Sequence, residues 1–105
     1  MAASSGSTHG RRRYLIAYDI TDDGRRGRVF HTLKAFGWWM QYSVFLCDLS
    51  ASEKIGLRWE LEELIDFSID KIMMVDLGET QGRGTSCFEF IGPPTELPSG
   101  GAHIV

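Results

Sequence analysis

Three aspartates and three arginines are concentrated in the stretch YDITDDGRRGRV, residues 18–29. Asp19 stands between the large apolar residues Tyr18 and Ile20. A carboxylate in such surroundings is poorly hydrated and requires a cation, a hydrogen-bond donor or a proton. Asp19 is therefore either a structural residue, which caps a helix or forms an ion pair, or a ligand of Mg²⁺, which proteins hold with one or two carboxylates and waters.

The arginines of this stretch are Arg25, Arg26 and Arg28. Guanidinium groups match phosphate oxygens, and the first turn of a helix also attracts anions. These arginines beside a metal bound to Asp19 would suit a phosphodiester; the alternative is a solvated basic helix face. One Asp per chain is few ligands for metal-assisted hydrolysis, but a two-fold dimer that joins both copies of Asp19 would supply a second.

Charge is distributed unevenly along the 105 residues, whose formal net charge is −3. Residues 1–45 carry seven Lys or Arg against three Asp, a net +4, whereas residues 46–105 carry four against eleven acidic residues, a net −7. One face of the protein would therefore meet a polyanion. With no apolar run of about 18 residues and no signal peptide, we expect a cytoplasmic protein without membrane contact.

Other chemistries find little support in the sequence. The two cysteines, Cys47 and Cys87, have neither the number nor the spacing of a disulfide framework or a zinc site, which favours reduced thiols. No Gly-rich phosphate loop or nucleophile elbow is present. Aromatic residues of the β-rich stretch could stack on bases, although such residues more often belong to a core or a dimer contact: Trp38, Trp39, Tyr42 and Phe45.

The elements that must position these residues follow from the apolar patterns. Residues 13–20 form a short apolar run typical of a central strand, and Thr21, Asp22 and Asp23 offer helix N-caps. An amphipathic helix is predicted over 24–36 and ends at Gly37. The later elements are one long strand or two short ones over 38–49, a helix over 55–65 opened by Ser50 or Ser52, a strand over 70–78 and a short strand over 86–92.

This order predicts an α+β protein with a ferredoxin-like βαββαβ fold, in which two helices cover one face of an antiparallel sheet and an additional C-terminal strand follows. A chain of this length is one domain. We expect a flexible lead over 1–12, the ferredoxin-like domain over 13–92, and a Pro/Gly-rich tail over 93–105.

The segments YLIAYDITDDGRRGRVFHTLKAFG and QYSVFLCDL resemble the small CRISPR-associated endoribonuclease family, the smaller of the two core proteins of spacer acquisition. The resemblance implies a homodimer, two strands in the 38–49 stretch, and a late strand that pairs with the partner's sheet. It implies Mg²⁺-dependent cleavage of single-stranded RNA or duplex DNA, with Asp19 as the catalytic metal ligand. Nucleic-acid contacts would fall on Arg26 and Arg28 of the helix, and on Ser43 and Phe45.

The sequence departs from this pattern before Gln41, where family members often carry a basic residue and this chain has WWM. That departure removes a phosphate contact, and it weakens the argument for catalysis more than the argument for the fold. Two functions therefore stay open: a metal-dependent endonuclease of CRISPR adaptation, and a non-catalytic dimeric adaptor that binds duplex DNA and bridges subunits of the CRISPR integrase.

Overall fold

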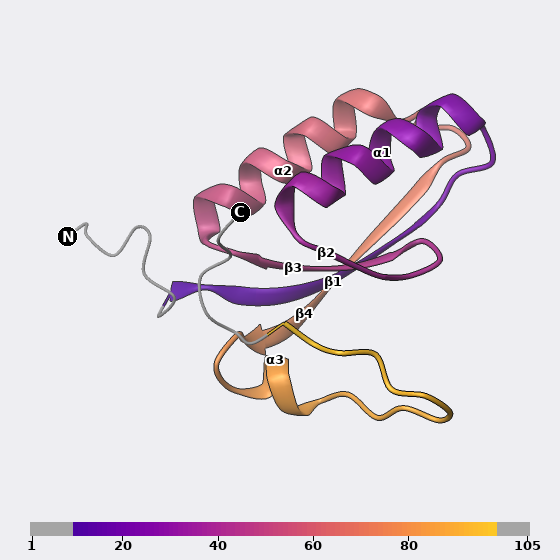
Figure 1. Ribbon diagram of the computed structural model, residues 1–105. Helices are drawn as coiled ribbons and strands as arrows, with labels where there is room; N and C mark the ends of the chain where they lie inside the picture. Colours follow the sequence, from indigo (N-terminus) through magenta and orange to yellow (C-terminus); the bar gives the residue numbers. More distant parts are fainter. Residues whose placement is uncertain (1–9, 99–105) are drawn as a thin grey trace.

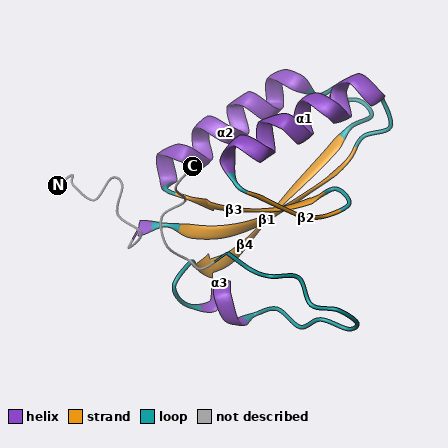
Figure 2. Ribbon diagram, viewed as in Figure 1, coloured by secondary structure: helices purple, strands orange, loops and turns teal. Residues whose placement is uncertain are grey.

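The computed structural model describes residues 10–98, in which four strands form one antiparallel sheet of order β2-β3-β1-β4 (Figure 1). Two long helices, α1 and α2, cover one face of this sheet (Figure 2). The predicted ferredoxin-like βαββαβ order is confirmed. The elements are β1 (Arg12–Asp19), α1 (Asp23–Phe36), β2 (Trp38–Gln41), β3 (Val44–Leu49), α2 (Ala51–Leu64), β4 (Lys71–Glu79) and the short α3 (Arg83–Ser86).

The core lies between the sheet and the two helices. Successive strand residues point to opposite faces, so β1 directs Tyr14, Ile16 and Tyr18 toward the helices, and all three are buried. Val29 and Leu33 of α1 meet them, as do Leu57 and Leu61 of α2. Burial of each such aliphatic side chain contributes about 1.5–3 kcal/mol, which fixes both helices on this face.

Each long helix begins at a side-chain cap. The Asp22 carboxylate accepts a hydrogen bond from the Arg25 backbone N–H at 2.9 Å, which starts α1 directly after β1. Ser50, rather than Ser52, caps α2, and its reciprocal hydrogen bonds with Glu53 form a capping box. Of the three predicted N-cap candidates for α1, Thr21, Asp22 and Asp23, the structure uses Asp22.

The β-rich stretch after α1 is two strands, not one. Gly37 ends α1, and β2 and β3 form a hairpin that turns at Tyr42 and Ser43. Tyr42 has a backbone φ of +48°, the left-handed conformation that tight hairpin turns require. This turn brings Ser43 beside the end of β1, where the Tyr18 N–H donates to the Ser43 carbonyl oxygen at 3.1 Å.

Two expectations about the chain ends need correction. Residues 86–92 form no strand in this chain: after β4 the backbone passes through α3, and Cys87–Ile91 pairs with none of the described strands. A short strand persists only where its backbone groups pair with a neighbour. Arg11 and Arg12, assigned above to a flexible lead, form ion pairs with Glu53 and Asp76. The predictions for residues 1–9 and 99–105 lie outside the described residues.

The face of the sheet opposite the two long helices is only partly covered. α3 and the segment after it lie on this side, at one end of the sheet (Figure 1). On β4, Met73 and Val75 alternate on this face and are exposed. No helix within residues 10–98 has the length and apolar character needed to cross a membrane.

Candidate functional site

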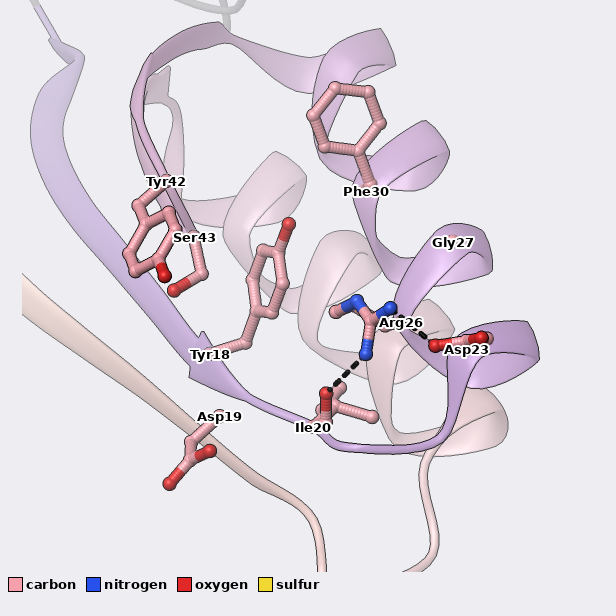
Figure 3. Close-up of a pocket in the computed structure, with 9 residues that line it drawn as sticks. All are labelled: Tyr18, Asp19, Ile20, Asp23, Arg26, Gly27, Phe30, Tyr42 and Ser43. Atoms are coloured by element: carbon pink, nitrogen blue, oxygen red, sulfur yellow. Dashed lines mark hydrogen bonds and ion pairs between the residues drawn. The ribbon is translucent and has the colours of Figure 1, made fainter.

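An open pocket of about 550 Å³ lies where β1 ends and α1 begins. Three segments line it: the end of β1, the first two turns of α1, and the β2–β3 turn (Figure 3). The lining residues are Tyr18, Asp19, Ile20, Asp23, Arg26, Gly27, Phe30, Tyr42 and Ser43. The charged stretch over residues 18–29 therefore borders an open pocket.

Arg26 is the cation of this pocket, and its guanidinium is anchored at several points. It donates to the carbonyl oxygens of Ile20 at 3.2 Å and Thr21 at 3.0 Å, and it pairs with the Asp23 carboxylate at 2.5 Å. Asp23 is exposed, and exposed ion pairs on one helix contribute only about 0.3–0.5 kcal/mol. An incoming phosphate can therefore replace Asp23 while the two carbonyl contacts keep the guanidinium in place.

Asp19 lies at the last position of β1 and is exposed. Figure 3 shows its carboxylate on the side of β1 away from the Tyr18 ring, which is the side free of the long helices. It stands opposite Lys71 in the β1–β4 register, yet its carboxylate has no hydrogen bond or ion pair within residues 10–98. Of the two alternatives for Asp19, the geometry gives no support to the cap or ion pair.

The metal-binding capacity of this site in one chain is small. Among residues 10–98, no group of three or more His, Cys, Asp or Glu side chains could hold a metal ion. Of the two acidic residues that line the pocket, Asp23 pairs with Arg26, and the Asp19 carboxylate lies on the other side of β1 (Figure 3). Proteins hold Mg²⁺ with one or two carboxylates and waters, and each chain would supply one such carboxylate, Asp19.

The other two helix arginines lie outside the pocket. Arg25 donates to the buried carboxylate of Asp70 at 2.6 Å and so ties α1 to the start of β4. Arg28 is exposed, and its guanidinium lies 3.4 Å from the position that a Cβ on Gly24 would take. Of the three predicted phosphate-binding arginines, the structure brings only Arg26 to the pocket, and Arg28 stays available on the adjoining surface.

The two predicted residues of the β2–β3 region differ in position. Ser43 lines the pocket. Phe45 is fully buried and packs edge-on against Phe30, with ring centroids 5.4 Å apart. The prediction of a direct nucleic-acid contact by Phe45 is therefore wrong, because alternation along β3 turns this ring into the core, where it supports the pocket wall formed by Phe30.

The first arginine cluster, RRR at 11–13, is structural. Arg11 pairs with Glu53 of α2, Arg12 with Asp76 of β4, and Arg13 with Asp48 of β3. The excess positive charge of the first 45 residues is thus largely paired within the fold. Sequence reasoning missed these partners because each lies at least 35 positions away along the chain.

Sequence reasoning also missed three pocket residues, Tyr18, Gly27 and Phe30. A signal existed for Phe30 and Gly27, which follow Asp23 and Arg26 at helical spacing and so share their side of α1. Tyr42 was named only among aromatic residues that could stack on bases or belong to a core or dimer contact, and its place in the pocket depends on the hairpin.

Comparisons with known proteins show which family this chain resembles. The family described as CRISPR associated protein Cas2 matches residues 12–84. The CRISPR-associated endoribonuclease Cas2 1 of Rhodospirillum rubrum is 44% identical over 68 residues, which cover 65% of this chain and 67% of that protein. The CRISPR-associated endoribonuclease Cas2 2 of Thermodesulfovibrio yellowstonii is 39% identical over 87 residues, 83% of this chain and 90% of that protein.

A solved structure extends the likeness to the fold. The crystal structure of Streptococcus pyogenes Cas2 superposes with a TM-score of 0.67 at 25% identity, over 76% of this chain and 99% of that one. The resemblance drawn from the YDI and QYSVF segments is thereby confirmed, and the chain belongs to the CRISPR-associated Cas2 family.

Proposed function

We propose that this CRISPR-associated chain acts as a homodimer that hydrolyses phosphodiester bonds of single-stranded RNA or duplex DNA with the aid of Mg²⁺. The observation that carries the proposal is the end of β1, where an anchored guanidinium, Arg26, lines the pocket on the helix side and a carboxylate without a partner in the described chain, Asp19, is exposed on the other side of the strand. Relatives at 44% and 39% identity carry the name endoribonuclease, which supports nucleic acid as the substrate.

A dimer would complete the carboxylate set. Asp19 lies on the same face of the sheet as the exposed side chains of Met73 and Val75. A second copy packed across this face would bury that apolar surface, and a two-fold axis near the end of β1 would bring both copies of Asp19 together. The two carboxylates repel each other when ionised, so a cation between them would favour the paired arrangement.

Four residues that line the pocket would then have specific roles. Arg26 holds a phosphate oxygen through its guanidinium, and the Ser43 hydroxyl can donate to a second oxygen from the opposite wall. Because Gly27 has no side chain, the phosphate can approach the backbone of α1 closely on that side. Asp19 provides metal ligands, and Mg²⁺ when bound supplies charge neutralisation and a more acidic water.

A second function has one observation in its favour. Because residues 10–98 contain no group of three metal-ligating side chains, each chain brings few ligands to a metal. The same dimer would then serve as an adaptor: Arg28 and Arg26 follow a duplex backbone, and the protein bridges subunits of the CRISPR integrase without hydrolysing DNA.

The test compares cleavage and binding by four proteins purified identically: the unchanged chain, Asp19→Asn, Arg26→Met and Arg58→Met. Arg58 is a matched control because it also forms an exposed ion pair on a helix, with Glu62 at 3.0 Å, but lies away from the pocket. Labelled single-stranded RNA and duplex DNA are incubated with Mg²⁺ or with EDTA.

The nuclease proposal predicts cleavage that requires Mg²⁺, falls by at least 100-fold in Asp19→Asn and is unchanged in Arg58→Met. Cleavage that persists in Asp19→Asn contradicts it. Absence of cleavage together with salt-dependent duplex binding, weakened in Arg26→Met, supports the adaptor instead.

A further inference from the structure

Two large aromatic side chains stand exposed at the β2–β3 hairpin, next to the pocket. Tyr42 is 90% exposed and lines the pocket with Arg26 and Ser43, and Trp39 is 55% exposed. Aromatic rings in a β-rich segment usually enter a core, as Phe45 does in the neighbouring strand. Exposure of this extent excludes a core role in this chain for either ring.

Tyr42 occupies a backbone position that does not suit it. Its φ of +48° makes it the single non-glycine residue with positive φ among those that the structure describes. Glycine or asparagine is the ordinary choice for such a turn, because a Cβ is crowded there. Residues held in sparsely populated backbone regions cluster at functional sites, and here the strained residue presents its ring at the mouth of the pocket.

Trp39 is held in place by the hairpin itself. Its indole N–H donates to the Tyr42 carbonyl oxygen at 2.8 Å, and its ring packs edge-on against Phe30 with centroids 6.1 Å apart. The indole N–H thus has its acceptor, and part of the apolar ring surface stays exposed to solvent. A ring that is already fixed loses little conformational freedom when a planar ligand binds.

The surroundings of these rings favour a nucleobase as that ligand. Figure 3 shows Tyr42 and Ser43 on one side of the pocket and Phe30 and Arg26 on the other, with the Tyr18 ring between them. If Arg26 holds a phosphate, the base of the same nucleotide would lie within reach of the Trp39 and Tyr42 rings. Base-aromatic stacking is tolerant of sequence, because every base has a π-face.

We propose that Trp39 and Tyr42 form a base-stacking subsite for the nucleotide whose phosphate Arg26 holds. The inference rests on the proposed function and deepens it, because it sets which nucleic acid the pocket prefers. The faces of a base in a duplex are covered by its neighbours, so a paired base must first leave the stack. The subsite therefore selects strands with an unpaired base at the phosphate that is bound.

The test measures the affinity of the protein for one single-stranded RNA and for a duplex of the same sequence. Ca²⁺ replaces Mg²⁺ in these measurements, so that a cation occupies the carboxylate oxygens while hydrolysis is avoided. Tyr42→Gly removes the ring and keeps a residue that the turn accepts, and Trp39→Ala removes the indole. Trp59→Ala is the matched control, because Trp59 is 63% exposed on α2, outside the pocket.

We expect Tyr42→Gly and Trp39→Ala each to weaken single-strand binding about tenfold, with less than a twofold effect on the duplex and no effect of Trp59→Ala. Single-stranded RNA should also quench tryptophan fluorescence in the unchanged chain and in Trp59→Phe, but much less in Trp39→Phe. Equal losses for single strand and duplex, or no loss at all, would overturn the subsite. A change of mass in solution caused by either variant would also overturn it, since the rings would then contact a second copy.

Arg26→Met separates this inference from the function beneath it. If Arg26→Met weakens binding of both ligands and the ring variants do not, only the stacking subsite fails. If Arg26→Met changes neither affinity, the pocket is not the nucleic-acid site, and the proposed function fails with it.

Discussion

The guanidinium of Arg13 donates two hydrogen bonds to the carboxylate of Asp48, at 2.7 and 2.9 Å, and the two side chains are only 0% and 1% exposed. They stand opposite each other in the β1–β3 register, on the face of the sheet away from the long helices. The same guanidinium donates to the carbonyl oxygens of Gly84 at 3.2 Å and Pro98 at 3.4 Å. One buried ion pair thus fastens α3 and the segment after it to the sheet.

Asp48→Ala should lower the free energy of unfolding by about 3–5 kcal/mol, because it leaves the buried charge of Arg13 without its partner. Urea unfolding followed by circular dichroism measures the change. The double variant Arg13→Met/Asp48→Leu should recover part of the loss, since apolar side chains of similar volume need no charged partner, while the carbonyl oxygens of Gly84 and Pro98 lose their donor. A loss below about 1 kcal/mol in Asp48→Ala would show that water reaches the guanidinium.

Gly37→Ala should destabilise the chain by about 1–3 kcal/mol or more, because α1 and β3 meet at this residue without space for a side chain. A Cβ there would lie 2.9 Å from the Cys47 Cα and closer still to the Leu46 carbonyl oxygen, and both belong to backbone that cannot turn aside. Thermal unfolding of the variant measures the effect.

Gly56→Ala is the matched control for this change. Gly56 lies within α2, and a Cβ built on it has no neighbour within 4 Å. Alanine should therefore raise stability by about 0.5–1 kcal/mol through helix propensity alone. If both substitutions raise stability, the backbone of β3 does not lie as close to Gly37 as the structure places it.

The order of elements was predictable because the local patterns are strong. The apolar run that ends at Ile20, the caps offered by Asp22 and Ser50, and the helical spacing of Val29 and Leu33 all agree with the fold. The short strand expected near Phe88 was not predictable, because β-rich composition fixes no partner strand and pairing depends on which backbone lies alongside.

The site was predictable only in part. Asp19 and Arg26 could be proposed from the local sequence, since both lie where β1 passes into α1. Whether a neighbouring arginine is free depends on partners distant in sequence, and Asp70 removes Arg25 from the pocket in a way that no local pattern reveals. The direction of Phe45 required the strand register, which the hairpin turn sets.

Cys47 should be unreactive in the folded protein. Burial, with a smaller contribution from the charge of Asp48, raises the pKa of the Cys47 thiol to about 12, and thiolate is the form that reacts. Cys87 is partly exposed. At pH 8 we expect a disulfide reagent such as DTNB to modify one thiol per chain in buffer and two in urea. Modification of two thiols in buffer would mean that β3 opens locally.

The ion pair between Arg25 and Asp70 should make stability fall in acid. The hydrogen bond from Arg25, helped by the backbone N–H of Asp66, holds the pKa of Asp70 below its usual range. Because the folded pKa is lower than the unfolded value of about 3.9, the pair contributes its full stability above that value. The contribution is then lost as the pH falls through the folded pKa.

Urea unfolding at pH 7, 5, 4 and 3 tests this dependence with the unchanged chain and Asp70→Asn. The stability difference between the two should be constant from pH 7 to 5 and should shrink below about pH 4, because protonation deprives Asp70 of the charge that asparagine also lacks. Arg25→Gln should reduce the same acid-sensitive component by removing the other partner. A difference between the unchanged chain and Asp70→Asn that stays constant down to pH 3 would show that the carboxylate binds Arg25 no better charged than neutral.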